Sequence, residues 1–319
     1  TISMTNKILI TGPLGHIGSK LIHSLKPGDY EEIVMVDNLS TQRYSSLFNL
    51  PKEIRYSFYE ENILKADLRS LFRNIDKVIH LAAITDATSS FERKDEVEEV
   101  NYLGTKKVVE ACVAEGCKLI FPSTTSVYGT QKELVDEDCE KSELQPQSPY
   151  AETKLKSEEF ISRMASKGKI EASIIRLGTI FGTSKGMRFH TAINKFCWQA
   201  VLGQPLTVWK TALNQKRPYL GINDAVNSIK FFINKEIFQG DIFNVVTSNY
   251  TVQEVIDSIK KYIKGVKINL VETQIMNQLS YEVSTKILES LGFTLQDDLD
   301  TGIKETIALL KDANNFSSY

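Results

Sequence analysis

Short apolar runs alternate with segments of helical periodicity along the first half of the chain. Most of these runs are apolar at successive positions, which is the pattern of parallel strands covered by helices on both faces. Strands are predicted at residues 7–11, 33–37, 54–59, 77–81, 118–122 and 170–176. Apolar positions at helical spacing predict helices at residues 16–26, 98–115 and 150–167. This alternation predicts an α/β fold with a doubly wound parallel sheet.

The second half of the chain has a more mixed pattern. Helices are predicted at residues 189–202, 223–234, 251–264 and 299–312, and one strand at residues 241–246. We therefore predict a Rossmann domain over residues 1–177. Residues 178–319 are predicted to form mainly a smaller mixed α/β lobe, with segments near 210–246 returning to the first domain.

Composition and charge narrow the class of protein. The chain has 319 residues, of which 42% are apolar and 24% charged, the balance of an ordinary globular protein. A net charge of −2 gives no electrostatic reason to bind nucleic acid or an anionic membrane. No apolar run approaches the ~20 residues of a membrane span, and the N-terminal pattern predicts no signal peptide. The four cysteines form no CxxC pair and have no histidine at zinc-ligand spacing. These features predict a cytoplasmic protein with reduced thiols and without a metal site.

A glycine-rich segment, TGPLGHIG at residues 11–18, follows the first predicted strand. Gly12, Gly15 and Gly18 would let the backbone approach a pyrophosphate, which the first N–H groups of the next helix can bind. The GxxGxxG spacing is typical of short-chain dehydrogenases. The alternative is a loop that only needs positive φ angles.

Asp37 makes the pyrophosphate interpretation stronger. It ends the second predicted strand about 20 residues after the loop, where a carboxylate accepts hydrogen bonds from an adenosine ribose. A 2′-phosphate would meet a like charge there, so Asp37 favours NAD over NADP, although Arg43 nearby acts in the other direction. We predict NAD as the cofactor.

Tyr150 and Lys154 lie four residues apart in the segment YAETK, so on a helix their side chains share one face. A phenol with a pKa of about 10 is a poor base at neutral pH, but an adjacent cation stabilises its phenolate. Tyr150 could then take a proton from a substrate hydroxyl while a hydride leaves the same carbon for a nicotinamide. Pro149 suits a helix start, which argues against the alternative of an exposed pair in mid-helix.

A cluster of hydroxyl side chains at residues 123–126 directly follows the strand predicted at 118–122. In an open α/β sheet, ligands bind at the carboxyl ends of the strands. A polar turn is the alternative, but the order of glycine loop, Asp37, hydroxyl cluster and Tyr150–Lys154 pair favours a catalytic site.

Together these motifs resemble those of the extended short-chain dehydrogenases, specifically the nucleotide-sugar epimerase/dehydratase family that includes UDP-galactose 4-epimerase. The resemblance spans essentially the whole chain. The matching segments are TGPLGHIG (11–18), VDNLST (36–41), HLAA (80–83), NYLGT (101–105), STTSVYG (123–129), SPYAETK (148–154) and IIRLGTIFG (174–182).

The resemblance implies roles residue by residue. The implied catalytic residues are Thr124, Tyr150 and Lys154. The implied cofactor-binding residues are Gly12, Gly15, His16, Ile17, Gly18, Asp37, Asn38, Asn62, Ile63, Leu81, Ala82, Ala83, Asn101, Tyr150 and Lys154. On the substrate side we expect Thr125, Ser126, Thr179, Arg188, His190 and Arg217, with Arg217 where related enzymes bind the substrate diphosphate.

Departures from the family pattern narrow the chemistry. Dehydratases of this family carry Asp-Glu directly after the catalytic threonine, and related decarboxylases carry Glu before Val-Tyr-Gly, whereas this chain has Thr125 and Ser126. Elimination and decarboxylation are therefore disfavoured. Two other positions depart at the diphosphate site: Thr179 replaces a common asparagine, and residues 274–281 contain no arginine.

Our leading hypothesis is an NAD-dependent nucleotide-sugar epimerase that oxidises a sugar hydroxyl transiently and then reduces it again. The second hypothesis is an NAD-dependent dehydrogenase or reductase of a sugar or related hydroxyl substrate. A non-catalytic dinucleotide-sensing protein on the same fold is a remote alternative. By resemblance, we expect a homodimer that packs through the helices predicted at 98–115 and 150–167.

Overall fold

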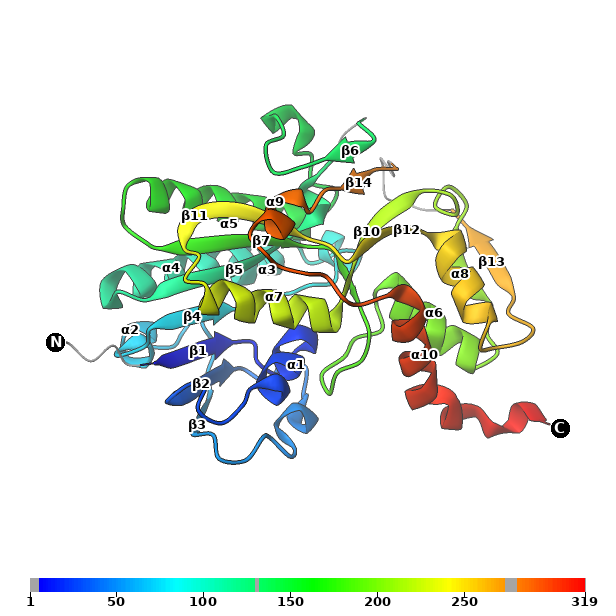
Figure 1. The fold of residues 1–319 in the computed structure, drawn as a ribbon, viewed down its shortest axis with the longest axis horizontal. Helices are drawn as coiled ribbons and strands as arrows, with labels where there is room; N and C mark the ends of the chain where they lie inside the picture. Colours follow the sequence, from blue (N-terminus) through cyan, green and yellow to red (C-terminus); the bar gives the residue numbers. More distant parts are fainter. Residues whose placement is uncertain (1–5, 130–131, 273–279, 319) are drawn as a thin grey trace.

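A single parallel sheet forms the larger part of the protein. The computed structural model describes residues 6–129, 132–272 and 280–318, and within them seven strands pair in the order β3-β2-β1-β4-β5-β7-β11 (Figure 1). The strands are β1 (Lys7–Thr11), β2 (Glu32–Asp37), β3 (Tyr56–Glu60), β4 (Lys77–His80), β5 (Lys118–Thr124), β7 (Ala172–Leu177) and β11 (Gln239–Val245). The strand order reverses between β1 and β4, which confirms the predicted doubly wound fold.

Helices cover both faces of this sheet (Figure 1). One face packs against α1 (His16–Ser24) and α7 (Ile222–Asn234). The other packs against α2 (Leu68–Phe72), α4 (Gly104–Glu115) and α5 (Pro149–Ser166). Ile8 and Ile10 of β1 point to the first face and Leu9 to the second, and all three are fully buried. This double coverage explains why the strands are continuous apolar runs.

The helix predicted at residues 98–115 is not regular. It begins as α3 (Lys94–Val97), continues as the π-helix η3 (Glu98–Leu103) and becomes α4 only at Gly104. The π-turn places Asn101 in the interior, where its amide pairs with the backbone of Ile84. π-turns occur mostly as single insertions and often at functional sites, and this one contacts Ile84 in the segment that follows β4.

A smaller lobe, α6, α8 and α10 with the strands β9 and β13, lies beside the carboxyl ends of the sheet strands (Figure 1). Its bounds are α6 (Ala192–Val201), β9 (Leu206–Trp209), α8 (Val252–Lys260), β13 (Ile268–Val271) and α10 (Leu299–Leu310). Apolar side chains of the three helices form one core with Leu206 and Val208 of β9. None of the helices in the described ranges is both long and apolar enough to cross a membrane.

Short strands connect the two parts. A three-stranded sheet has the order β12-β10-β8, and two further strands, β14 and β6, pair with each other. Their bounds are β6 (Leu134–Val135), β8 (Thr179–Phe181), β10 (Lys216–Gly221), β12 (Ser248–Thr251) and β14 (Glu282–Val283), with α9 (Lys286–Ser290) following β14. Single-turn 3₁₀ segments lie at Tyr44–Leu47, Ser89–Phe91, Thr125–Val127 and Lys141–Glu143, and a longer one, η6 (Lys311–Ser318), follows α10. Because β11 pairs with β7 after the chain has passed through α6, the two parts share the chain rather than following one another.

Candidate active site

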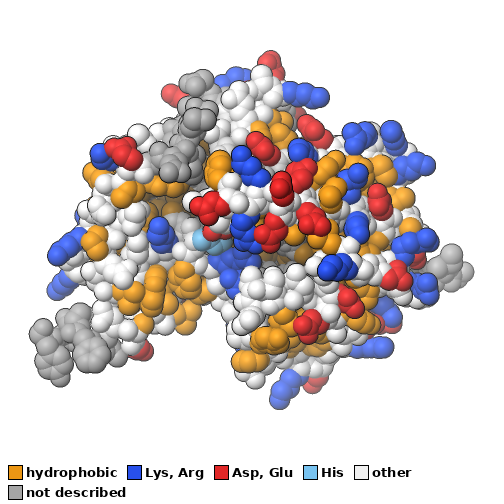
Figure 2. All heavy atoms as spheres, turned by 180° about the vertical axis from the view of Figure 1, so that it is seen from behind, with side chains coloured by type: hydrophobic (Ala, Val, Ile, Leu, Met, Phe, Trp, Pro, Cys, Tyr) orange, Lys and Arg blue, Asp and Glu red, His pale blue; other side chains and the backbone are white. Residues whose placement is uncertain are grey.

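A cavity of about 1070 Å³ runs along the carboxyl ends of the sheet strands and under the smaller lobe. Gly12 after β1, Asp37 of β2, Leu81 after β4 and Thr124 of β5 all lie in its wall. Figure 2 shows this face hollowed between the two parts of the molecule, with Lys, Arg and His side chains at the hollow. This is the position at which open α/β sheets bind ligands.

The glycine loop forms one end of the cavity. A side chain at Gly12, whose φ is +67°, would meet the backbone nitrogen of Ala82 at 2.6 Å, and one at Gly18 would meet the carbonyl oxygen of Gly12 at 2.5 Å. Close backbone atoms therefore leave no room for a side chain at Gly12 or Gly18. Gly15 is different, because its nearest neighbour would be 3.6 Å away, so its open side faces the cavity. A loop with free space at Gly15 and the N-terminus of α1 behind it fits the diphosphate of a dinucleotide.

Asp37 closes the loop from the second strand. Its carboxylate accepts hydrogen bonds from the backbone N–H of Leu14 at 3.3 Å and of Leu39 at 2.9 Å. The carboxylate lines the cavity together with Asn38. Burial lowers the pKa of Arg43, and the Asp37 charge opposes that shift. Asp37 is thus positioned to accept hydrogen bonds from a ribose, as the preference for NAD requires.

The floor of the cavity follows β4. Leu81, Ala82 and Ala83 line it, and His80 lies buried behind them between the hydroxyls of Thr11 (2.7 Å) and Thr105 (3.1 Å). Burial lowers the pKa of His80 to about 3, so this ring is neutral at physiological pH. His80 therefore supports the floor without adding charge to it.

Asn101 requires a correction. It was expected among the cofactor-binding residues, but it does not line the cavity. Its amide oxygen accepts from the Ile84 N–H at 2.8 Å, and its amide nitrogen donates to the Ile84 carbonyl at 2.9 Å. Because the protein backbone uses both ends of the amide, Asn101 holds the wall segment that begins at Ile84 rather than a ligand.

The start of α5 carries the predicted catalytic pair. Ser148 caps the helix by accepting a hydrogen bond from the Ala151 N–H at 3.1 Å, and Pro149 occupies the first helical position. Tyr150 and Lys154 then point from one face of the helix into the cavity wall. The Thr124 hydroxyl interacts with the Tyr150 phenol and favours its ionised form, and Lys154 Nζ donates to the carbonyl of Pro122 at 2.9 Å.

The electrostatics differ from the expectation for this pair. Burial raises the pKa of Tyr150 to about 12, while the Thr124 hydrogen bond and the positive charge of Arg188 act to lower it. Burial likewise lowers the pKa of Lys154 to about 8, with the Glu158 charge acting to raise it. Lys154 Nζ lies 5.9 Å from the centroid of the Tyr150 ring and donates to the Pro122 carbonyl of β5, so burial dominates the pKa of the phenol in this arrangement.

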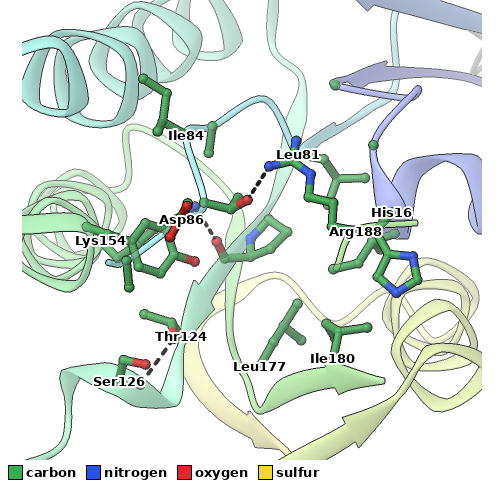
Figure 3. Close-up of a pocket in the computed structure, with 18 of the residues that line it drawn as sticks. His16, Leu81, Ile84, Asp86, Thr124, Ser126, Lys154, Leu177, Ile180 and Arg188 are labelled. Carbon is green, nitrogen blue, oxygen red and sulfur yellow. Dashed lines mark hydrogen bonds between the residues drawn. The ribbon is translucent and has the colours of Figure 1, made fainter. Parts of the chain in front are cut away.

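The positions after Thr124 carry hydroxyls and no carboxylate. Thr125 is buried and donates to the Leu177 carbonyl at 3.3 Å, while Ser126 is half-buried in the cavity wall. The Thr124 hydroxyl also accepts from the Ser126 N–H at 3.1 Å (Figure 3). Neither Thr125 nor Ser126 therefore offers a carboxylate for general acid–base catalysis.

The wall opposite Tyr150 comes from the segment after β8. Arg188 donates to the Thr85 hydroxyl at 2.6 Å and lies beside His16 (Figure 3). Burial and the charge of Arg188 together lower the pKa of His16 to about 3. His190 also lines this wall, and its pKa is lowered by burial and by Arg188.

The remaining predicted residues lie at both ends of the cavity, with Arg217 and Thr179 at the end far from the glycine loop. Arg217 lies over the ring of Tyr281, 5.8 Å from its centroid, and donates to the Gln215 side chain at 2.9 Å. Thr179 pairs with Tyr219 across β8 and β10. Ile17, Asn62 and Ile63 line the cavity near the glycine loop end. Of the segment at 274–281 that was noted for lacking arginine, residues 274–279 lie outside the described residues.

Sequence reasoning missed several lining residues. Thr85 and Asp86 follow the floor strand, and Trp209 and Tyr281 lie at the far end. The first two come two and three residues after the motif HLAA, so their place could have been inferred from it. Tyr281 ends the segment 274–281 that the sequence already placed at the diphosphate site, whereas Trp209 reaches the cavity only through tertiary packing.

Comparisons with known proteins agree with this geometry. Residues 8–245 match the family described as "NAD dependent epimerase/dehydratase family". YtcB of Bacillus subtilis, described as an uncharacterized UDP-glucose epimerase, is 32% identical over 248 residues, which are 75% of this chain and 76% of that protein. The dTDP-D-glucose 4,6-dehydratase of Mus musculus is 28% identical over 323 residues, covering 96% of this chain and 88% of its own.

A solved structure is similar over the whole chain. The UDP-glucuronic acid 4-epimerase of Bacillus cereus, in complex with UDP-glucuronic acid and NAD, superposes with a TM-score of 0.86 at 26% identity and covers 97% of this chain and 100% of that one. The fold and site thus define an NAD-dependent enzyme of the extended short-chain dehydrogenase type. The chain belongs to the NAD-dependent epimerase/dehydratase family.

Proposed function

We propose that the enzyme is a UDP-sugar 4-epimerase that keeps NAD bound throughout turnover. The observation that carries the proposal is the placement of Thr124 and Tyr150 together in the cavity wall, with hydroxyls rather than carboxylates following at Thr125 and Ser126. These residues can move a hydroxyl proton, but they offer no acid and base for eliminating water.

The proposed reaction needs no reactant other than the sugar substrate and NAD. Tyr150 accepts the proton of the C4 hydroxyl, while Thr124 holds the reacting oxygen. NAD held by the glycine loop and Asp37 would supply the hydride acceptor and donor, so that C4 could be oxidised to a ketone and then reduced from its other face. Tyr150 then gives its proton back, so the product is the C4 epimer and no net oxidation occurs.

The test is to incubate the holoenzyme with UDP-sugars, to identify the sugar products by NMR, and to follow the absorbance of reduced NAD. We expect an equilibrium mixture of epimers without net NADH. Stoichiometric accumulation of NADH would instead support the dehydrogenase hypothesis. Failure of every UDP-sugar to react would contradict the proposed epimerase.

Arg188 favours a sugar acid within this substrate class. Its guanidinium lies in the wall that faces Tyr150, and Thr85 holds it there. A carboxylate on C5 of the sugar would pair with this half-buried charge, and the similar enzyme of Bacillus cereus has UDP-glucuronic acid bound. We therefore expect kcat/KM for UDP-glucuronic acid to exceed that for UDP-glucose.

The variant Arg188→Met tests this preference. It should reduce the ratio of kcat/KM for UDP-glucuronic acid over UDP-glucose by roughly 10²-fold, because one charged hydrogen-bonding partner is lost. The ratio is the measurement, since a general effect on Tyr150 would lower both values equally. A wild-type enzyme that prefers UDP-glucose would contradict the assignment to a sugar acid.

The proposed homodimer would use α4 and α5. Leu103, at the junction of η3 and α4, is an apolar side chain with 44% of its surface exposed. Burying it against a second copy would remove apolar surface from water. Light scattering of the purified enzyme should give twice the monomer mass, and Leu103→Glu should lower that mass.

A further inference from the structure

Helix α5 carries three ionisable side chains in a row. Tyr150, Lys154 and Glu158 follow one another at intervals of four residues, so all three lie on the inner face of the helix. Tyr150 and Lys154 line the cavity. Glu158 lies deeper, with only 2% of its side chain exposed, and no step of the proposed reaction uses it.

The Glu158 carboxylate joins α5 to the ends of two strands. Arg176 of β7 binds it through two parallel bonds, from Nε to Oε1 at 3.0 Å and from Nη2 to Oε2 at 2.7 Å. The Ser123 hydroxyl of β5 donates to Oε1 at 2.5 Å. Ser123 directly precedes Thr124, so the carboxylate is linked to the backbone that carries the catalytic hydroxyl.

The remaining donor group of Arg176 extends the network. Its Nη1 donates to the hydroxyl of Tyr128 at 2.9 Å, and that hydroxyl donates to Asn244 Oδ1 at 2.7 Å. Asn244 lies on β11, and its amide nitrogen donates to the carbonyl of Ser284 at 3.1 Å. One chain of hydrogen bonds therefore runs from α5 across β5, β7 and β11 to the segment after β14.

Stability alone does not account for such a network. Taking two charges out of water costs several kcal/mol each, and apolar residues of similar volume often stabilise a core as well or better. The Arg176–Glu158 pair is almost fully buried beneath an apolar sheet face. What the network adds is directional geometry, because Arg176 and Ser123 both donate hydrogen bonds to the Glu158 carboxylate.

We propose that Glu158 is a positioning residue of the active site, which fixes the inner face of α5 against the strand end that carries Thr124. It acts through Arg176 and Ser123 on the distance at which Tyr150 and Thr124 meet. The role in catalysis rests on the proposed function, whereas its effect on Lys154 can be measured without a substrate.

Charges around Lys154 give the proposal a pH signature. On its own helix Lys154 is faced by Tyr150 and Glu158, and from β4 by His80, which is neutral. Behind Glu158 lies Arg176, which is faced in turn by Tyr128, Glu137 and Cys139. Glu158 is the charge that raises the pKa of Lys154 against the effect of burial. Without that carboxylate, Lys154 should lose its proton at a lower pH.

The first test is Glu158→Gln, which keeps the shape and removes the charge. We expect kcat to fall by roughly 10²-fold with little change in KM, as misplacement of catalytic groups predicts. The alkaline limb of the kcat–pH profile should move to lower pH. Loss of activity that is uniform across pH would mark a merely structural role and overturn the proposal.

A second variant covers the case in which Glu158→Gln does not fold. Glu158→Leu combined with Arg176→Met replaces the whole pair by apolar side chains and should retain a wild-type Tm within a few degrees. We expect this variant to bind NAD normally and still to lose kcat by roughly 10²-fold. A folded double variant with wild-type kcat would overturn the proposal.

The control is an exposed ion pair that joins α5 to η3. Lys156 binds Glu98 at 3.0 Å, and both side chains are more than one third exposed, so Glu98→Gln should leave kcat and its pH profile unchanged. The pKa of Lys154 can also be read by NMR of lysine-labelled enzyme with NAD bound and no sugar present. A pKa equal in wild type and Glu158→Gln would refute the electrostatic part, whereas inactivity of the wild type on all UDP-sugars would refute only the proposed function.

Discussion

The Tyr150 phenol lies in an environment that opposes its ionisation. Burial raises its pKa to about 12, and the groups acting against burial are the Thr124 hydroxyl and the Arg188 guanidinium. Both groups favour the ionised phenol, which is the form that can accept a proton. The proposed chemistry at Tyr150 therefore depends on the Thr124 hydroxyl and the Arg188 charge beside the phenol.

Tyr150→Phe removes only the hydroxyl and keeps the ring that fills the wall. We expect epimerisation to fall by at least ~10³-fold, within the range of lost general-base catalysis. NAD content and Tm should stay at wild-type values, because Tyr150 is half-buried and its ring is retained. Product analysis by NMR and the absorbance of bound NAD measure the two effects, and substantial residual turnover would show that another group is the base.

Residue identities were predictable wherever a motif fixed them. Gly12, Asp37 and Tyr150 follow from motif spacing and Thr124 from the family resemblance, and all four line the same cavity. The pKa of Lys154 did not follow, because the partner of its ammonium is the Pro122 carbonyl, and no local pattern reveals which backbone oxygen a lysine will reach.

At the scale of elements, α5 is defined by its first residues. Ser148 supplies the cap and Pro149 the first helical residue, so Tyr150 falls in the first turn, whose geometry the cap controls. The same signals made the helix start predictable. The π-turn of η3 was not predictable, since it depends on Asn101 meeting the backbone of Ile84, a contact of tertiary structure.

Ser148→Ala should lower the free energy of unfolding by ~1 kcal/mol, the usual effect of losing an N-cap. It should also lower kcat, because the first turn of α5 frays where Tyr150 is attached. Thr251→Ala is the matched control, since Thr251 caps α8 in the same way, at 3.1 Å to the Glu254 N–H, outside the cavity wall. Denaturant unfolding and steady-state kinetics should show equal stability losses but a kcat loss only for Ser148→Ala.

At the scale of the whole molecule, the segment between β8 and α6, which leads into the smaller lobe, contacts the glycine loop through Gly186. Its N–H donates to the Ser19 hydroxyl at 2.9 Å, and a side chain there would lie 2.2 Å from the carbonyl oxygen of Leu14. The neighbouring Lys185 donates to the carbonyl of Phe48 at 2.6 Å. The segment that leads to Arg188 is therefore packed directly on the loop expected to bind the diphosphate.

Gly186→Ala should disturb both the glycine loop and the segment that leads to Arg188. The atoms nearest to the added methyl group are backbone atoms, so no rotamer change can relieve the contact. We expect a lower Tm together with NAD that is lost on gel filtration, measured as cofactor content per enzyme. Gly265→Ala is the control: its φ of +73° makes any side chain strained, but no atom lies within 4 Å. It should lower Tm while NAD content stays constant, and equal NAD loss in both variants would refute the contact as the cause.

The doubly wound architecture was predictable from the runs of apolar residues, because burial on both faces leaves that pattern in the sequence. The short strands that connect the two parts were not. Arg217 of β10 pairs with Tyr250 of β12, and Thr179 of β8 with Tyr219, and strands this short gain their stability from partners distant in the sequence.

The position of β11 has a consequence for how the protein is made. As the nascent chain leaves the ribosome, β7 emerges and can join β5, but its other edge has no partner until residues 239–245 have been translated. During that interval an apolar strand with free backbone N–H and C=O groups is open to pairing with other chains. The vulnerable stage of biosynthesis is therefore the translation of the segment between these two strands, and a chaperone that shields sheet edges would matter most then.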